Sequence, residues 1–254
     1  MNTQVLTSRP AISESVPIRT LQVLNVVFFS LTIFVNYLAN GLPLNGKTTG
    51  ELSQQYPNLF TPAGFTFAIW GLIYTLLIIF CIYQARSLFN RTRDVSVETV
   101  VRKIGVLFIL TCVLNMAWIL AWHYEYTALS VVLMLAFLGV LIRLNLNLGV
   151  SFTSISRQEK YLAHIPFGIY FGWITVATIA NITAFLVDYR WDGFGFPAEF
   201  WAVAMLLIGT LVTLFVVIKT NNIFYGLTVI WGFVGIIAKR YALIETEPFQ
   251  SVPY

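Results

Sequence analysis

Aromatic and amide side chains recur at helical spacing in three apolar stretches of the chain. They are Phe67, Trp70 and Tyr74 in the first stretch, Asn115, Trp118 and Trp122 in the second, and Trp173, Ala177 and Asn181 in the third. Residues three or four apart share one face of an α-helix, so each stretch presents an aromatic face. If the three faces converge, indole rings could stack on a flat apolar ligand while amides orient its polar edge. Ala177 would leave room for that ligand.

The same pattern also fits a purely structural role. Membrane helices commonly pack through aromatic side chains, and an asparagine that bridges two helices contributes about 0.6 to 2 kcal/mol. Both interpretations stay open until the arrangement of the helices is known.

Other kinds of chemistry have little support in the sequence. No Asp, Glu, Lys or Arg lies in the middle third of any apolar stretch, whereas ion pumps and proton relays depend on such groups. His123 and His164 stand at stretch ends and are a weak signal for a metal. Hydrolytic and phosphate-binding motifs are absent, so we expect no catalytic residue and no metal. A retinal Schiff base is also disfavoured, because Lys219 and Lys239 stand at stretch ends.

The stretches that must position these residues are predicted transmembrane helices. Of 254 residues, 58% are hydrophobic and 10% are charged, against roughly a quarter charged in soluble domains. A helix needs about 20 mostly apolar residues to cross a bilayer. Suitable runs lie near residues 20–40, 63–85, 102–123, 127–148, 163–187, 200–218 and 222–238. The sequence predicts an all-α, polytopic bundle of about seven transmembrane helices, with a flexible polar tail at 1–19 and a C-terminal tail at 241–254. Cys81 and Cys112 fall within predicted spans, so no disulfide framework is expected.

Basic residues are distributed unevenly between the two ends of this bundle. With the N-terminus inside, eleven lysines and arginines fall on one side, and Lys47, Arg190, Lys239 and Arg240 fall on the other. The positive-inside tendency then predicts a cytoplasmic N-terminus and an external C-terminus. The basic residues that give the net charge of +4 are thus expected to orient the protein in the membrane. We therefore expect the lipid bilayer rather than nucleic acid as a partner.

The longest connection between predicted spans runs from Gly41 to Pro62 and is rich in Gly, Pro, Asn and Thr. Connections beyond about 12 to 15 residues are often functional lids. We expect this segment to order against the bundle and to cover a site on the outer side. A simple tether between two helices is the alternative.

The motifs, in this order, resemble the translocator protein or tryptophan-rich sensory protein (TspO) family. The matching residues are Pro62, Trp70 and Tyr74 in the second predicted helix, Leu114, Asn115 and Trp118 in the third, and Pro166, Trp173, Ala177 and Asn181 in the fifth. The resemblance covers roughly residues 20–187. Two features depart from the family: Ile119 stands where a Ser usually follows the tryptophan, and two further helices follow over 188–240.

The resemblance implies a five-helix core over 20–187 whose pocket is closed by the loop after the first helix. Such a pocket binds porphyrins, haem or related tetrapyrroles and, in some members, sterols. By this resemblance Trp70 and Trp173 would flank the ligand, Asn115 and Trp118 would complete the wall, Ala177 would line the floor, and Pro57 and Pro62 would belong to the lid. No cofactor is required, and a bound tetrapyrrole is the expected small hydrophobic ligand.

Three functions remain open. The first is a membrane-embedded binding protein or sensor for a flat hydrophobic ligand, either a tetrapyrrole or a sterol-like lipid. The second is a small-molecule or lipid transporter, motivated by the two added helices. The third is an intramembrane enzyme acting on a pigment or lipid, although no general acid or base is visible. The chain is expected as a monomer or a homodimer, and a monomer if the added helices cover the face through which five-helix relatives dimerise.

Overall fold

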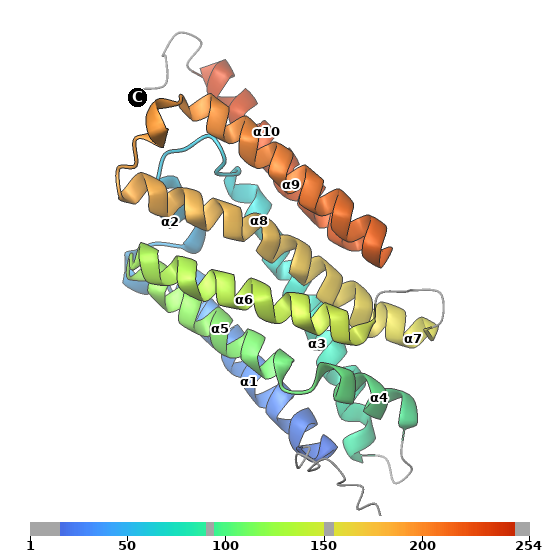
Figure 1. Ribbon diagram of the computed structural model, residues 1–254. Helices are drawn as coiled ribbons and strands as arrows, with labels where there is room; N and C mark the ends of the chain where they lie inside the picture. Colours follow the sequence, from blue (N-terminus) through green and yellow to red (C-terminus); the bar gives the residue numbers. More distant parts are fainter. Residues whose placement is uncertain (1–15, 90–93, 150–154, 247–254) are drawn as a thin grey trace, which may run out of the picture.

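The computed structural model describes residues 16–89, 94–149 and 155–246, and all regular secondary structure in these ranges is helical (Figure 1). Within them, six helices are long and apolar enough to cross a membrane. They are α1 (Ile18–Asn40), α3 (Ile69–Phe89), α6 (Thr127–Leu148), α8 (Ile165–Asp188), α9 (Ala198–Thr220) and α10 (Ile223–Thr246). The pair α4 (Val95–Ile104) and α5 (Leu107–His123), bent by 50°, passes the same test as one broken span. The predicted all-α, polytopic bundle is confirmed, with six or seven crossings.

The third predicted span, 102–123, is broken where it was expected to be continuous. Gly105 caps α4 with φ 55° and ψ −134°, a conformation that glycine adopts without a steric penalty. The helix before the break is amphipathic, since it buries Val97, Val100, Val101 and Ile104 while Val95 and Arg102 are exposed. The predicted span is therefore divided into the amphipathic helix α4 and the apolar helix α5.

The last helix is longer than predicted. α10 continues to Thr246, past the expected end at 238, because Lys239 and Arg240 can remain helical while their long side chains extend toward a polar environment. The C-terminal tail is correspondingly shorter than 241–254. The remainder of the two predicted tails, 1–15 and 247–254, lies outside the described residues.

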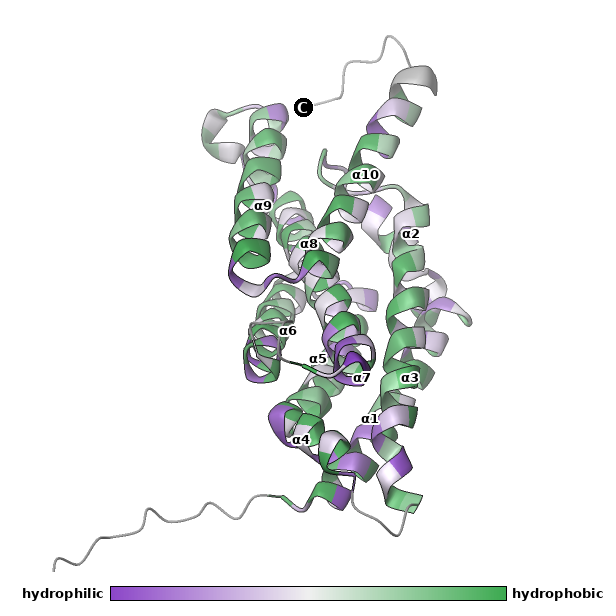
Figure 2. Ribbon diagram, turned by 90° about the vertical axis from the view of Figure 1, so that its right-hand side faces the viewer, coloured by the Kyte–Doolittle hydropathy of each residue, from purple (hydrophilic) through white to green (hydrophobic). Residues whose placement is uncertain are grey.

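The helices form layers around α8, which packs against α3, α6 and α10. In its most apolar stretch 61% of the residues are buried, compared with 6% in α9. α9 contacts α10 at the edge of the bundle, and Figure 2 shows it as an almost continuously hydrophobic helix. An apolar helix exposed on nearly all sides is stable only against lipid. The chain is therefore an integral membrane protein in contact with the bilayer.

Small residues allow α8 and α10 to approach closely. A Cβ atom added at Gly172 would lie 2.7 Å from the carbonyl oxygen of Tyr225 and 2.9 Å from Cβ of Thr228. The Tyr225 hydroxyl donates a hydrogen bond to Thr175 Oγ1 at 3.2 Å. Helices in lipid associate through such close backbone packing and interhelical hydrogen bonds, so α10 is a fixed part of the bundle.

Candidate functional site

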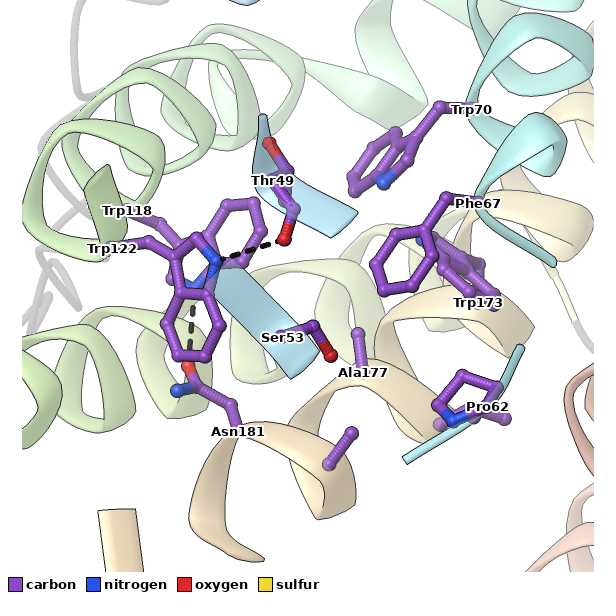
Figure 3. Close-up of a pocket in the computed structure, with 12 residues that line it drawn as sticks. Thr49, Ser53, Pro62, Phe67, Trp70, Trp118, Trp122, Trp173, Ala177 and Asn181 are labelled. Atoms are coloured by element: carbon purple, nitrogen blue, oxygen red, sulfur yellow. Dashed lines mark hydrogen bonds between the residues drawn. The ribbon is translucent and has the colours of Figure 1, made fainter. Parts of the chain in front are cut away.

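A pocket lies between α3, α5 and α8, beneath the connection that follows α1 (Figure 3). Its lining combines hydroxyl, aromatic, amide and small apolar side chains. They are Thr49, Ser53, Pro62, Phe67, Trp70, Trp118, Trp122, Trp173, Val176, Ala177, Ala180 and Asn181. Seven of the ten residues that the sequence predicts for the site or its lid are in this set.

Four tryptophans form most of the wall. The ring centroids of Trp70 and Trp118 are 6.3 Å apart with 27° between their planes, and those of Trp118 and Trp122 are 6.3 Å apart with 17°. Trp173 meets Trp70 edge-on, at 6.3 Å and 84°. Both arrangements are favourable for aromatic pairs. The three faces predicted from the sequence therefore do converge, and they present flat π surfaces in two orientations.

The indole N–H groups of the wall differ in their partners. Trp118 Nε1 donates to Asn181 Oδ1 at 3.0 Å, and Asn181 Nδ2 donates to Ser130 Oγ at 2.8 Å. Trp173 is 2% exposed, and its Nε1 has no hydrogen-bond partner among the described residues. A buried donor without a partner costs about 1–3 kcal/mol. An acceptor on a bound molecule could relieve that cost.

Three residues named from the sequence do not line the pocket. Asn115 joins helices instead: its Oδ1 accepts from Asn36 Nδ2 at 2.7 Å, and its Nδ2 donates to Tyr170 Oη at 3.4 Å. Tyr74 lines a neighbouring cavity between α1 and α3, and Pro57 is exposed on the lid. Asn115 and Tyr74 are on the expected helix faces but stand one turn farther from the lid than Trp118 and Trp70, and the pocket does not reach that depth.

The segment over residues 42–63, called the lid below, is ordered and partly helical. It contains η1 (Leu44–Gly46) and α2 (Thr49–Gln54). α2 starts with a capping box, in which the backbone N–H of Thr48 donates to Glu51 Oε2 at 2.7 Å and the backbone N–H of Glu51 donates to Thr48 Oγ1 at 3.3 Å. The hydrogen bonds from the Thr48 backbone and hydroxyl lower the pKa of Glu51. α2 places Thr49 and Ser53 over the pocket.

His123, the last residue of α5, fastens the lid to the bundle. Its Nδ1 lies 3.0 Å from the carbonyl oxygen of Leu44, and its Nε2 lies 3.1 Å from Thr49 Oγ1. A carbonyl can only accept, so Nδ1 carries the hydrogen and Nε2 of the neutral ring accepts from the Thr49 hydroxyl. Asn45 Nδ2 donates to the His123 carbonyl at 2.9 Å. This histidine, expected at a span end, is buried and closes the lid.

Aromatic contact adds to these polar contacts. Tyr56 of the lid packs on Trp122, with ring centroids 5.7 Å apart, and burial together with the Glu125 and Asp188 carboxylates raises the pKa of Tyr56 to about 12. Trp122 Nε1 donates to the carbonyl oxygen of Thr49 at 3.4 Å. Trp122 thus belongs to both the pocket wall and the lid contact.

The closed pocket is small, but larger cavities adjoin it. Its volume is about 40 Å³, enough for a few water molecules. A cavity of about 400 Å³ between α1 and α3 shares Thr49, Phe67 and Trp70 with it. Another, of about 720 Å³, lies between the lid and α10 and shares Phe67. Displacing α2 and the Phe67 ring would join these spaces.

The pocket has no charged side chain among its lining residues. In the described part of the chain no three His, Cys, Asp or Glu side chains are grouped as metal ligands. His164, the second histidine, lies away from the pocket, with its Nε2 3.4 Å from Glu159 Oε1. The arrangement is suited to stacking and hydrogen bonding.

The family follows from comparison with known proteins. A family model described as TSPO-like protein matches residues 22–250. This chain belongs to the TSPO-like family. The match includes α9 and α10, whereas the resemblance read from the sequence ends near residue 187. Family membership indicates a membrane-embedded protein of the binding or transport class. Comparison with curated proteins and with solved structures gave no significant match.

Five lining residues were not predicted as site residues. They are Thr49, Ser53, Trp122, Val176 and Ala180. Trp122 shares a helix face with Trp118 at a spacing of four residues, and this spacing is the signal in the sequence that points to it. Thr49 lies within a Thr-x-x-Glu sequence at 48–51, which is a capping-box signature, and Ser53 follows it. That signature would have revealed a lid helix, although not the side of the bundle on which it lies.

Proposed function

We propose that this protein binds a flat, largely apolar small molecule between α3, α5 and α8, beneath the lid. The observation that carries the proposal is the wall of four indoles together with the Nε1–H of Trp173, which has no partner in the described part of the chain. Flat aromatic walls favour a planar ligand, and one buried donor favours an acceptor in its plane. A tetrapyrrole, which is planar and aromatic and carries acceptor oxygens on the acid groups at its edge, fits this description best, and a sterol-like lipid is the alternative ligand.

Binding requires the lid to move. Ligand pockets of this kind measure roughly 300–1,000 Å³, whereas the closed pocket measures about 40 Å³. The contacts to be broken include individual hydrogen bonds between the lid and His123 or Trp122, each worth about 0.5–1.5 kcal/mol net. A ligand that buries both faces against indole rings can offset several such bonds. The lid then acts as a cover that opens for exchange.

Titration with protoporphyrin, followed by tryptophan fluorescence in detergent or nanodiscs, tests the proposal. The wild type should show saturable quenching, and the double variant Trp70→Ala and Trp173→Ala should lose it. Trp191→Ala with Trp201→Ala is the matched control, because these two tryptophans lie in and after the connection between α8 and α9 and do not line the pocket. Loss of saturation in the control, or its survival in the pocket variant, would overturn the site.

Transport is the second candidate function, and the cavity between α1 and α3 favours it. This cavity is lined by Ile33 and Tyr37 of α1 and reaches Trp70 of the pocket wall. It provides a sideways path along which an apolar ligand could exchange with lipid. Proteoliposome flux of a labelled ligand separates the two functions, since a sensor binds without net transport.

A further inference from the structure

A second cavity adjoins the tryptophan pocket and lies between the lid and the C-terminal part of α10. Its volume is about 720 Å³. Figure 1 shows α2 and the C-terminal end of α10 at the same end of the molecule. One wall is fixed, because Trp231 Nε1 donates to the carbonyl oxygen of Thr66 at 3.0 Å and the Ala63 N–H donates to the carbonyl oxygen of Gly235 at 3.0 Å. The opposite wall is α2, which belongs to the lid.

This cavity is amphipathic. Phe65, Phe67, Ala238 and Leu243 supply carbon surface, while Lys239 supplies a cation. A cavity of this composition is suited to a molecule with an apolar body and a charged head group.

The cation of Lys239 has no acidic partner among the described residues. Its Nζ donates to Gln54 Oε1 of the lid, a neutral acceptor. The one carboxylate in the lining, Glu51, accepts from the backbone and hydroxyl of Thr48 within the α2 capping box. Partly buried cations are ordinarily paired with an anion, so the site has a positive charge for which the described chain supplies no counter-charge.

A lysine at the end of a membrane helix can also serve only to reach the polar interface. Arg240 provides the comparison, because it is the next basic residue on α10 and does not line the cavity. A general interfacial role would apply to both residues, whereas a binding role would apply to Lys239 alone.

We propose that the cavity between the lid and α10 binds an amphiphile with an anionic head group, a carboxylate or a phosphate, whose charge pairs with Lys239. Its apolar part lies against Phe65 and Phe67. The head group has two sources, an anionic phospholipid of the surrounding leaflet or the acid groups of the tryptophan-pocket ligand, since Phe67 lines both cavities. Only the second source rests on the proposed function.

The first arm of the experiment uses lipid. The full-length protein is equilibrated with equal amounts of phosphatidylglycerol and phosphatidylcholine, and retained lipids are counted by native mass spectrometry. If the lipid is the occupant, the wild type retains phosphatidylglycerol preferentially and Lys239→Met reduces that preference about tenfold, the size of one charge-assisted hydrogen bond. Lys239→Arg restores the preference, and Arg240→Met keeps it.

The second arm uses protoporphyrin and its dimethyl ester in phosphatidylcholine nanodiscs. If the pocket ligand supplies the head group, the wild type binds the acid more tightly than the ester, and Lys239→Met weakens the acid about tenfold without affecting the ester. If the proposed function is wrong, the wild type will bind neither protoporphyrin nor its ester. In that case the lipid arm alone tests the cavity between the lid and α10. Unchanged results for Lys239→Met in both arms, or equal losses with Arg240→Met, overturn the site.

Discussion

Two tryptophans of the pocket are matched in size and burial but differ in the use of the indole N–H. Trp118 is 5% exposed and Trp173 is 2% exposed. The first donates to Asn181, and the second has no partner among the described residues. The first N–H therefore stabilises the folded protein, whereas burial of the second without an acceptor destabilises it.

Replacing each tryptophan by phenylalanine separates these roles. Trp118→Phe should lower the free energy of unfolding by about 1–3 kcal/mol, because Asn181 Oδ1 loses its donor. Trp173→Phe should cost less stability, since an unpaired donor is removed, yet weaken ligand binding by about 2- to 10-fold. Thermal unfolding in detergent and ligand titration measure the two effects. Equal stability losses with unchanged affinity would mean that the Trp173 N–H does not serve a ligand.

The proposed exchange of ligand depends on opening of the lid, and His123 holds the lid closed through hydrogen bonds to Leu44 and Thr49. His123→Phe retains a ring but removes both nitrogen contacts, to Leu44 and Thr49. The loss of two hydrogen bonds, about 1–3 kcal/mol, should increase the rate of amide hydrogen exchange over residues 42–56 about tenfold or more.

His164→Phe is the control for that measurement. His164 directly precedes α8, and α8 begins at the end of the bundle opposite to the lid (Figure 1), so replacement of His164 should leave lid exchange unchanged. Unaltered exchange in His123→Phe would show that other contacts hold the lid closed.

The close packing of α8 against α10 can be tested by adding a methyl group at the contact. Gly172→Ala places a Cβ within 2.7 Å of the Tyr225 carbonyl oxygen, so the helices must separate, at a cost of about 1–3 kcal/mol. Gly139→Ala in α6 has no atom within 4 Å of the new Cβ and should be neutral or stabilising, since alanine favours helix. Thermal unfolding compares the two variants, and similar melting temperatures would argue against close packing as the anchor of α10.

The sequence predicts the membrane-spanning helices well but does not predict how deep the pocket extends between them. Apolar run length predicts the crossings because hydrocarbon tolerates only helices with satisfied backbones, and spacing correctly placed Trp70, Trp118 and Trp173 on converging faces. Spacing could not show that the pocket stops one turn short of Asn115. The fastening of the lid by His123 joins residues 74 and 79 positions apart, and no local pattern reveals such pairs.

At the scale of the whole molecule, the two ends of the bundle differ in charge. Lys47 lies in the lid, Arg190 follows α8, and Lys239 and Arg240 lie in the last part of α10, whereas the other basic residues of the described chain lie toward the opposite ends of the helices. The positive-inside tendency therefore leads us to propose that the lid faces outward.

Cysteine labelling tests this orientation. Gln55→Cys on the lid should react with a membrane-impermeant maleimide in intact cells, whereas Gln158→Cys, exposed at the other end, should react only after lysis. The native Cys81 and Cys112 are buried and free, so they should contribute little background. The reverse labelling pattern would invert the orientation.

The central claim is that the four indoles under the lid bind a flat ligand. The chain has seven tryptophans, so replacing Trp191, Trp201 and Trp231 by phenylalanine leaves only the four of the pocket wall. Fluorescence titration of this variant with protoporphyrin is the most direct measurement. Binding between these indoles predicts saturable quenching of most of the emission, with the dissociation constant of the wild type. Quenching that rises linearly without saturation would contradict it.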